Sequence, residues 1–252
     1  MAKNVIVNGA AGGMGVAALR ILALRDVNVA CVDVDESRVS QAIASLGKTK
    51  GRFLAFGADV SDEAEVASCF SKTLEAFGSL HGIFNIAGIE GKLLPVREST
   101  VENFDRVIAV NARSVFLSMK HGVSHLIAAG GGSIVSTGSY LATRGVPLCG
   151  SYGASKHAIV GLTKSFALEV AEQNVRANVI APGATETRMI RAMFAAISDD
   201  TAAAQAAMIG GIPQKRMAQP DEVAATGIWL LLDAPNHITG QVLRVDGGQS
   251  AA

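Results

Sequence analysis

The chain has 252 residues, 49% of them hydrophobic, and its 22 basic side chains balance 22 acidic ones. That length allows a substantial core within one domain. A net charge of zero argues against a nucleic-acid or anionic-membrane partner, because both need a basic surface. The longest apolar stretches are interrupted by charges, so none spans a bilayer. Three widely separated cysteines, Cys31, Cys69 and Cys149, argue against a disulfide framework and favour a reducing, cytoplasmic location.

Short apolar runs alternate with longer stretches of helical periodicity along the chain. The predicted strands, rich in valine and isoleucine, lie in residues 4–10, 28–35, 52–60, 82–88, 132–139, 175–183 and 241–248. The predicted helices lie in residues 15–26, 36–46, 63–77, 101–128 and 152–172. Strands with few polar residues that alternate with helices predict an α/β fold whose parallel sheet is covered on both faces.

Residues 187–220 differ from the rest of the chain, because they are rich in alanine and methionine and have no strand pattern. We expect a helical insertion between two strands, which forms a mobile substrate lid. No charge block, repeat or low-complexity linker marks a domain boundary. We therefore predict a single domain over residues 1–252.

The first predicted strand leads into "NGAAGGMG", residues 8–15, and then into a helix. This layout is typical of a dinucleotide-binding turn. Gly9 permits the tight turn, Gly13 lets the backbone approach a pyrophosphate, and Gly15 lets the helix pack close to the sheet. The alternative is an ordinary glycine-rich loop, because one glycine motif is a weak signal.

Asp33 ends the second predicted strand, where a carboxylate can accept hydrogen bonds from the adenosine ribose. Its charge would repel a 2′-phosphate, and the next residue, Val34, is not the Arg or Lys expected at an NADP site, so the sequence favours NAD. The alternative is that Asp33 caps the following helix. Asp35 or Ser37 can supply that cap, which leaves Asp33 free for the cofactor.

Tyr152 and Lys156 are four residues apart on a predicted helix and therefore share one face. A tyrosine has a pKa of about 10, and a neighbouring ammonium stabilises its phenolate. Such pairs are also common on surface helices, so the context matters. Ser139 ends a strand thirteen residues before Tyr152, and Asn111 is an unexplained amide in a helix with apolar neighbours.

Together these motifs resemble the short-chain dehydrogenase/reductase family over nearly the whole chain. The family's T-G-x-x-x-G-x-G corresponds to "NGAAGGMG", its N-N-A-G to "NIAG" at residues 85–88, and its Y-x-x-x-K to residues 152–156. Two positions depart from the pattern: Asn8 replaces a threonine and keeps its hydrogen-bonding capacity, whereas Ile86 replaces an amide that ties strands together. Neither position carries chemistry.

The resemblance implies a Rossmann-type, doubly wound sheet that binds a dinucleotide and catalyses a reaction in the same domain. The catalytic residues that it implies are Asn111, Ser139, Tyr152 and Lys156. The cofactor-binding residues that it implies are Gly9, Gly13, Met14, Gly15, Asp33, Val34, Asp59, Val60, Asn85, Ala87, Gly88, Tyr152, Lys156, Pro182, Gly183, Thr185 and Thr187.

The implied enzyme interconverts a secondary alcohol and its ketone by hydride transfer with NAD. Tyr152 exchanges the proton, Lys156 lowers the tyrosine pKa and holds ribose hydroxyls, and Ser139 stabilises charge on the substrate oxygen. Asn111 holds a water that extends the proton path from Lys156 to solvent. Thr187 and the backbone after Pro182 position the carboxamide of the cofactor.

The expected lid is largely apolar, and its methionines adapt to varied shapes, so an uncharged, hydrophobic substrate is expected. The runs "AGIEGK" and "VDGGQSAA" resemble those of levodione reductase and related cyclic-ketone and cyclic-alcohol dehydrogenases, which favours a cyclic substrate. Glu90 in the first run either approaches the substrate or is an exposed loop carboxylate. The alternatives are a 3-oxoacyl thioester reductase, which shares the catalytic residues, and an NAD(H)-binding sensor without catalysis.

The sequence also bears on metal binding and on the oligomeric state. His121 and His125 are four apart on a predicted helix, but no third ligand has suitable spacing, so we expect no metal site. Members of the family are mostly tetramers or dimers that pair through the long helices. We therefore expect a homo-oligomer, a tetramer in preference to a dimer.

Overall fold

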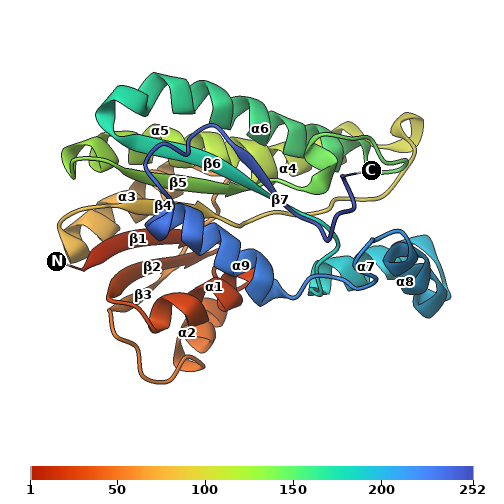
Figure 1. The fold of residues 1–252 in the computed structure, drawn as a ribbon, viewed down its shortest axis with the longest axis horizontal. Coiled ribbons are helices and arrows are strands. Elements are labelled where there is room, and N and C mark those ends of the chain that lie inside the picture. Colours follow the sequence, from red (N-terminus) through yellow and green to blue (C-terminus); the bar gives the residue numbers. More distant parts are fainter. Residues whose placement is uncertain (1, 252) are drawn as a thin grey trace.

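The computed structural model describes residues 2–251, whose strands form one parallel sheet (Figure 1). The seven strands follow the order β3-β2-β1-β4-β5-β6-β7. Their bounds are β1 Lys3–Asn8, β2 Val27–Asp33, β3 Phe53–Gly57, β4 Gly82–Asn85, β5 Gly132–Thr137, β6 Val175–Pro182 and β7 Val242–Val245. The α/β fold predicted from the sequence is thus confirmed.

Helices cover both faces of this sheet (Figure 1). One face carries α1 (Gly13–Ala23), α2 (Glu36–Ala44) and α9 (Pro220–Ile228), which pack with the strands into one hydrophobic cluster. The other face carries α3 (Glu63–Phe77), α4 (Val101–Ile108), α5 (Ser114–Ala128) and α6 (Gly150–Val170), and a second cluster lies beneath them. The inner strands β1, β2, β4, β5 and β6 are therefore buried on both sides, which explains their nearly continuous apolar runs, whereas the edge strands β3 and β7 are partly exposed.

The predicted helix 101–128 is not uniform. A π-helical segment, η2 (Ala109–Arg113), separates α4 from α5, and the main-chain N–H of Ser114 bonds the carbonyl of Ala109, five residues back. Asn111 lies in this segment and is fully buried. Single π turns of this kind are frequent at functional sites. The apolar periodicity alone does not reveal such an interruption.

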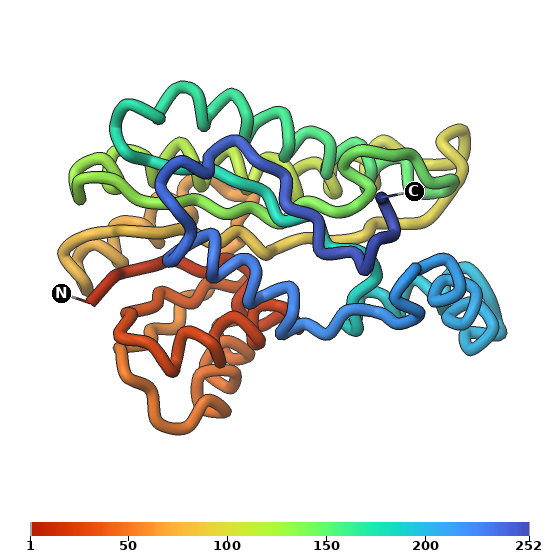
Figure 2. The backbone as a smooth tube through the Cα atoms, viewed as in Figure 1, coloured from red at the N-terminus to blue at the C-terminus, as the bar shows by residue number. Residues whose placement is uncertain are grey.

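The predicted insertion contains two helices, α7 (Arg188–Ile197) and α8 (Thr201–Gly210), which project beyond the sheet (Figures 1 and 2). They share a small hydrophobic cluster of their own. Helix α9 begins directly after the insertion and was not predicted from the sequence. Pro220 at its first turn and a capping box between Gln219 and Glu222 were the available signals.

The strand order reverses between β1 and β4, and such a switch point opens a crevice at the carboxyl ends of parallel strands. Gly9 follows β1 and Ala87 follows β4, so two predicted cofactor-binding segments meet at this crevice. Among residues 2–251, no helix combines the length and apolarity needed to cross a membrane.

Candidate active site

The glycine turn is packed too tightly for larger residues. Gly9 has a φ of +85°, and a Cβ there would lie 2.5 Å from the main-chain nitrogen of Ala87. A Cβ on Gly15 would lie 2.1 Å from the carbonyl oxygen of Gly9. These contacts explain why positions 9 and 15 are glycines.

The N-terminus of α1 also lacks a side-chain cap, because Gly12 occupies the capping position. By contrast, Asp35 caps α2 and Asp62 caps α3. Free N–H groups at a helix N-terminus attract an anion such as a pyrophosphate. A Cβ on Gly13 would lie 3.3 Å from Thr187 Cγ2, so the glycine turn faces the start of the lid. The turn therefore fits a dinucleotide cofactor.

A row of polar side chains links the carboxyl ends of three neighbouring strands. Asn8 Nδ2 donates to Asn85 Oδ1 at 2.8 Å, and Asn85 Nδ2 donates to Ser136 Oγ at 3.2 Å. All three side chains are buried. Asn8 thus ties β1 to β4 through its amide, while Ile86 lines the neighbouring cavity and takes no part in the row.

Asp33 is held beside the glycine turn. Its Oδ2 accepts the Ala11 N–H at 3.0 Å, and its Oδ1 accepts the Val34 N–H at 2.9 Å. Asp35 caps α2 by accepting the N–H groups of Ser37 and Arg38. Asp33 is therefore free of the capping role and remains half-buried at the end of β2, where an adenosine ribose would lie.

Asn111, Lys156 and Gly88 converge below the crevice. Asn111 Oδ1 accepts the Ile89 N–H at 2.8 Å, and its Nδ2 donates to Ile89 O and Ser155 Oγ, both at 2.9 Å. A Cβ on Gly88 would lie 3.3 Å from Asn111 Oδ1 and 3.4 Å from Lys156 Nζ. Both amide hydrogens of Asn111 are used, so a water can bond this side chain only through its oxygen.

Lys156 is buried, and its Nζ donates to the carbonyl oxygen of Thr137 at 2.8 Å. The same nitrogen lies 5.5 Å from the centre of the Tyr152 ring. Burial lowers the pKa of Lys156 to about 8. Burial raises the pKa of Tyr152 to about 12, and a hydrogen bond from Ser139 acts in the opposite direction. Burial thus dominates the tyrosine pKa, and the lowering of this pKa by Lys156 stays a prediction.

The predicted segment after β6 forms the boundary between the sheet and the lid. A Cβ on Gly183 would lie 2.9 Å from Asp246 Cα, so the strand packs tightly on the chain after β7. Thr187 caps α7 by accepting the Ile190 N–H. Pro182, Gly183, Thr185 and Thr187 all line the cavity described next.

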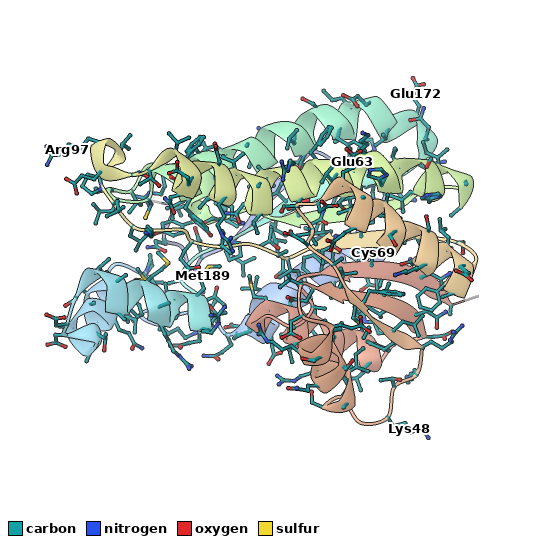
Figure 3. The ribbon with its side chains drawn as sticks, turned by 180° about the vertical axis from the view of Figure 1, so that it is seen from behind. Lys48, Glu63, Cys69, Arg97, Glu172 and Met189 are labelled. Atoms are coloured by element: carbon teal, nitrogen blue, oxygen red, sulfur yellow. The ribbon has the colours of Figure 1, made fainter. Side chains whose placement is uncertain are left out.

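A cavity of about 400 Å³ lies between the lid and the ends of the strands, and Ser139, Tyr152 and Lys156 reach it together. Figure 3 shows Met189 on the side of the lid that faces the rest of the molecule. The lid contributes an apolar wall of Met189, Ile190, Met193, Phe194, Ile197 and Met208. The opposite wall consists of Leu93, Tyr140, Leu141, Val146, Pro147, Leu148 and Cys149.

This second wall, formed by Leu93 and residues 140–149, was not predicted from the sequence. The run "YLATRGVPLC", residues 140–149, has no periodic pattern, and its only signal was its place between Ser139 and Tyr152. Glu90 is half-buried, and its charge contributes to the raised pKa of Tyr152, although Glu90 does not line the cavity.

Two predicted cofactor-binding residues, Asp59 and Val60, lie apart from this cavity. Asp59 is exposed, and its Oδ1 accepts the N–H and the hydroxyl of Ser61 at 2.8 and 2.7 Å. Val60 is half-buried beside it. Both follow β3, on the same side of the switch point as Asp33, and their contact with the cofactor stays a prediction.

The two histidines of α5 have partners of other kinds. His121 Nε2 lies 3.1 Å from Glu63 Oε1, and Lys120 Nζ lies 2.6 Å from the same oxygen. His125 stacks on Phe70 with ring centres 6.4 Å apart. Within the described residues, no group of three or more His, Cys, Asp or Glu has an arrangement suited to a metal ion.

Comparison with known proteins gives matches over nearly the whole chain. A family model described as "Enoyl-(Acyl carrier protein) reductase" matches residues 9–250. The 2,5-dichloro-2,5-cyclohexadiene-1,4-diol dehydrogenase of Sphingobium indicum is 36% identical, and the match covers 99% of this chain and 97% of that protein. Levodione reductase of Leifsonia aquatica is 36% identical, with 99% and 95% covered. Cyclohexanol dehydrogenase of an Acinetobacter species is 33% identical, with 99% and 95% covered.

Among solved structures, a crystal structure of levodione reductase superposes with a TM-score of 0.96 at 35% identity. The superposition covers 99% of this chain and 98% of that one. The similarity therefore includes the lid helices as well as the sheet.

Proposed function

Since the chain belongs to the short-chain dehydrogenase/reductase family and is an oxidoreductase that interconverts secondary alcohols and ketones, we propose that its substrates are uncharged cyclic ones and that its cofactor is NAD(H). The observation that carries the proposal is the cavity, whose two long walls are mostly apolar and carry no charged side chain, and whose floor holds Ser139, Tyr152 and Lys156. A charged sugar phosphate has no basic side chain on these walls to bind. The cyclic substrates in the names of the diol dehydrogenase and the cyclohexanol dehydrogenase support this choice.

In this proposal the bound nicotinamide dinucleotide supplies the hydride acceptor or donor. Tyr152 accepts the proton of the alcohol hydroxyl during oxidation and returns it to the carbonyl oxygen during reduction. The Ser139 hydroxyl hydrogen-bonds the same oxygen and stabilises its developing charge. The buried ammonium of Lys156 favours the tyrosinate, and Asn111 positions the Ile89 loop and Ser155 around it.

A screen of alcohols with NAD tests the proposal. We expect purified protein to oxidise cyclohexanol and its ring-substituted relatives with NAD, as measured by the absorbance of the reduced nicotinamide. Linear polyols and sugar phosphates serve as controls and should give no turnover. Turnover of a 3-oxoacyl thioester in place of the cyclic compounds would favour the thioester reductase. Binding of NADH without turnover of any substrate would favour the sensor.

Replacing Asp33 by alanine should switch the cofactor preference. The substitution removes the carboxylate that would repel a 2′-phosphate, and Arg38, whose Nη2 donates to Ala11 O at 3.3 Å, already lies beside the turn. We expect the ratio of kcat/KM for NADP to that for NAD to rise by about 100-fold, which corresponds to roughly 3 kcal/mol of relieved repulsion.

Asp35→Ala is the matched control, because it removes a neighbouring carboxylate that caps α2. It should cost about 1 kcal/mol of stability and leave the cofactor ratio unchanged. Wild-type protein that used NADP and NAD with equal kcat/KM would show that Asp33 does not select the cofactor.

The proposal also includes the domain organisation, the lid, the oligomeric state and the location of the protein. Residues 1–252 act as one catalytic domain, and the segment 187–220 is the mobile lid that covers the substrate. Exposed apolar side chains on the helical face, Phe104, Phe116 and Leu168, support a homo-oligomer, a tetramer in preference to a dimer. Three free, buried cysteines are compatible with the cytoplasm that the sequence suggested.

A further inference from the structure

We propose that the hydroxyl of Tyr140 binds a second oxygen of the substrate, so that the site prefers cyclic diols, hydroxyketones or diones over simple cyclic alcohols. This inference rests on the proposed function, because it concerns the same cavity. Tyr140 follows directly after Ser139 and lines the cavity wall opposite the lid.

Tyr140 differs from the other polar residues of the cavity in that its hydroxyl is available to a ligand. Apart from the proposed catalytic side chains, five lining residues carry a hydroxyl or thiol: Thr137, Tyr140, Cys149, Thr185 and Thr187.

The hydroxyl or thiol groups of the other four residues are less available to a ligand than that of Tyr140. The hydroxyls of Thr185 and Thr187 each donate to a main-chain carbonyl two residues earlier, at 3.1 and 3.3 Å. The Thr137 hydroxyl has no hydrogen-bond partner among residues 2–251, but it is fully buried and so is not accessible to a ligand, and a Cys149 thiol is only a weak donor. Tyr140 is half-buried, and its hydroxyl forms no hydrogen bond with any of residues 2–251. It is therefore the strong donor that remains available to a ligand.

The ring of Tyr140 is held in place from two sides. It begins the short helix η3 (Tyr140–Ala142), whose capping group is Ser139, and the Oγ of Ser139 accepts the Leu141 N–H at 3.1 Å. The guanidinium carbon of Arg144 lies 6.0 Å from the centre of the ring, and Arg144 Nη1 donates to Gln249 O at 3.2 Å. A phenol on a capped turn, with Arg144 beside its ring, loses less conformational freedom on binding a ligand than one on an open loop.

Tyr140 and Tyr152 also interact electrostatically. A charge on Tyr140 contributes to the raised pKa of Tyr152, which agrees with two phenols that belong to one cavity. Burial raises the pKa of Tyr140, so its hydroxyl keeps its proton at neutral pH and can donate. Tyr152 would then hydrogen-bond the reacting oxygen of the substrate, and Tyr140 would hydrogen-bond a second oxygen on the same substrate ring.

The substrate chemistry follows from the cost of unpaired polar groups. A diol whose second hydroxyl faced only apolar walls would lose a water hydrogen bond without replacement. A bond to Tyr140 removes that penalty. A ring with a single oxygen neither gains from Tyr140 nor loses by its absence.

Tyr140→Phe tests the inference, because it removes one oxygen atom and keeps the ring. We expect kcat/KM for cyclohexane-1,4-diol to fall by about 10-fold, mainly through a higher KM, while the value for cyclohexanol changes by less than about 2-fold. Met193→Leu reshapes the apolar lid wall without touching a hydroxyl and should change both values by the same factor. Equal losses for the two alcohols in Tyr140→Phe would overturn the inference.

Binding gives a readout that needs no turnover. With NADH present, cyclohexane-1,4-dione should raise the melting temperature of wild-type protein more than cyclohexanone does, and Tyr140→Phe should abolish this difference. An identical difference in both proteins would count against Tyr140. If wild-type protein oxidises cyclohexanol and Tyr140→Phe leaves the diol and dione measurements unchanged, the proposed function stands and only the inference fails. If the dione stabilises wild-type protein but not Tyr140→Phe, and wild-type protein oxidises no alcohol, the inference stands and only the proposed function fails.

Discussion

Tyr152→Phe should lower kcat for cyclic-alcohol oxidation by about 1,000-fold, within the range expected for the loss of a general acid–base group. The substitution removes the phenolic hydroxyl beside Ser139 and Lys156 and leaves the ring in place. The measurement is steady-state turnover with NAD at saturating substrate. NADH binding, followed by nicotinamide fluorescence, should be nearly unchanged, because the ring and Lys156 remain.

The pH dependence of wild-type protein is the internal control for this role. Burial raises the pKa of Tyr152 to about 12, so the protonated form predominates at neutral pH. Oxidation requires the deprotonated form, and its kcat/KM should therefore rise as the pH rises from neutral to alkaline. The residual activity of Tyr152→Phe should lack this rise. Full activity in the variant, or the same pH profile in both proteins, would remove Tyr152 from the proton transfer.

Gly9→Ala should destabilise the fold by about 2–5 kcal/mol, because a left-handed φ costs roughly 1–2 kcal/mol and a forced contact with backbone costs about 1–3 more. The φ of Gly9 is +85°, and the new Cβ would lie 2.5 Å from Ala87 N. The melting temperature should fall by roughly 5–15 °C at a fixed protein concentration. NADH affinity should also fall, because α1 and the Ala87 loop have to move apart.

The variant Gly130→Ala separates the cost of the left-handed φ from the cost of the forced contact with the backbone. Gly130 has a nearly identical φ of +86°, but a Cβ there meets no atom within 4 Å. This control should lose only the conformational part, about 1–2 kcal/mol, and keep its NADH affinity. If both variants lost the same stability and the same affinity, the close approach of Gly9 to Ala87 would have no role in the cofactor site.

The fold was predictable because its signals are local. Parallel strands buried on both faces require continuous apolar runs, and the helices between them require an apolar stripe. The bounds of α3 agree with the predicted helix at residues 63–77. The break at Asn111 was not predictable, because the π turn accompanies bonds to Ile89 and Ser155, which are distant in sequence.

In the candidate site, too, the residues with a local sequence signal were predicted, and the contacts between distant segments were not. The glycine turn, Asp33 and the Tyr152–Lys156 pair carry recognisable spacing, so they were found one motif at a time. The joining of Asn8 to Asn85 across two strands has no local signature, although it explains how Asn8 substitutes for a threonine. Tyr140 was missed for the same reason, because its place in the cavity depends on the turn that Ser139 caps.

By itself, the sequence determined the parallel α/β fold, the residues of the cofactor turn and the chemical types available for proton transfer. These depend on residue identity and on short periodic spacing, which the linear chain records directly. Only the tertiary structure decided the shape of the substrate cavity, because the lid and the 140–149 wall come from distant segments. It also decided the protonation of Tyr152 and Lys156, because burial sets the desolvation of both groups, and burial exists only after the chain has folded.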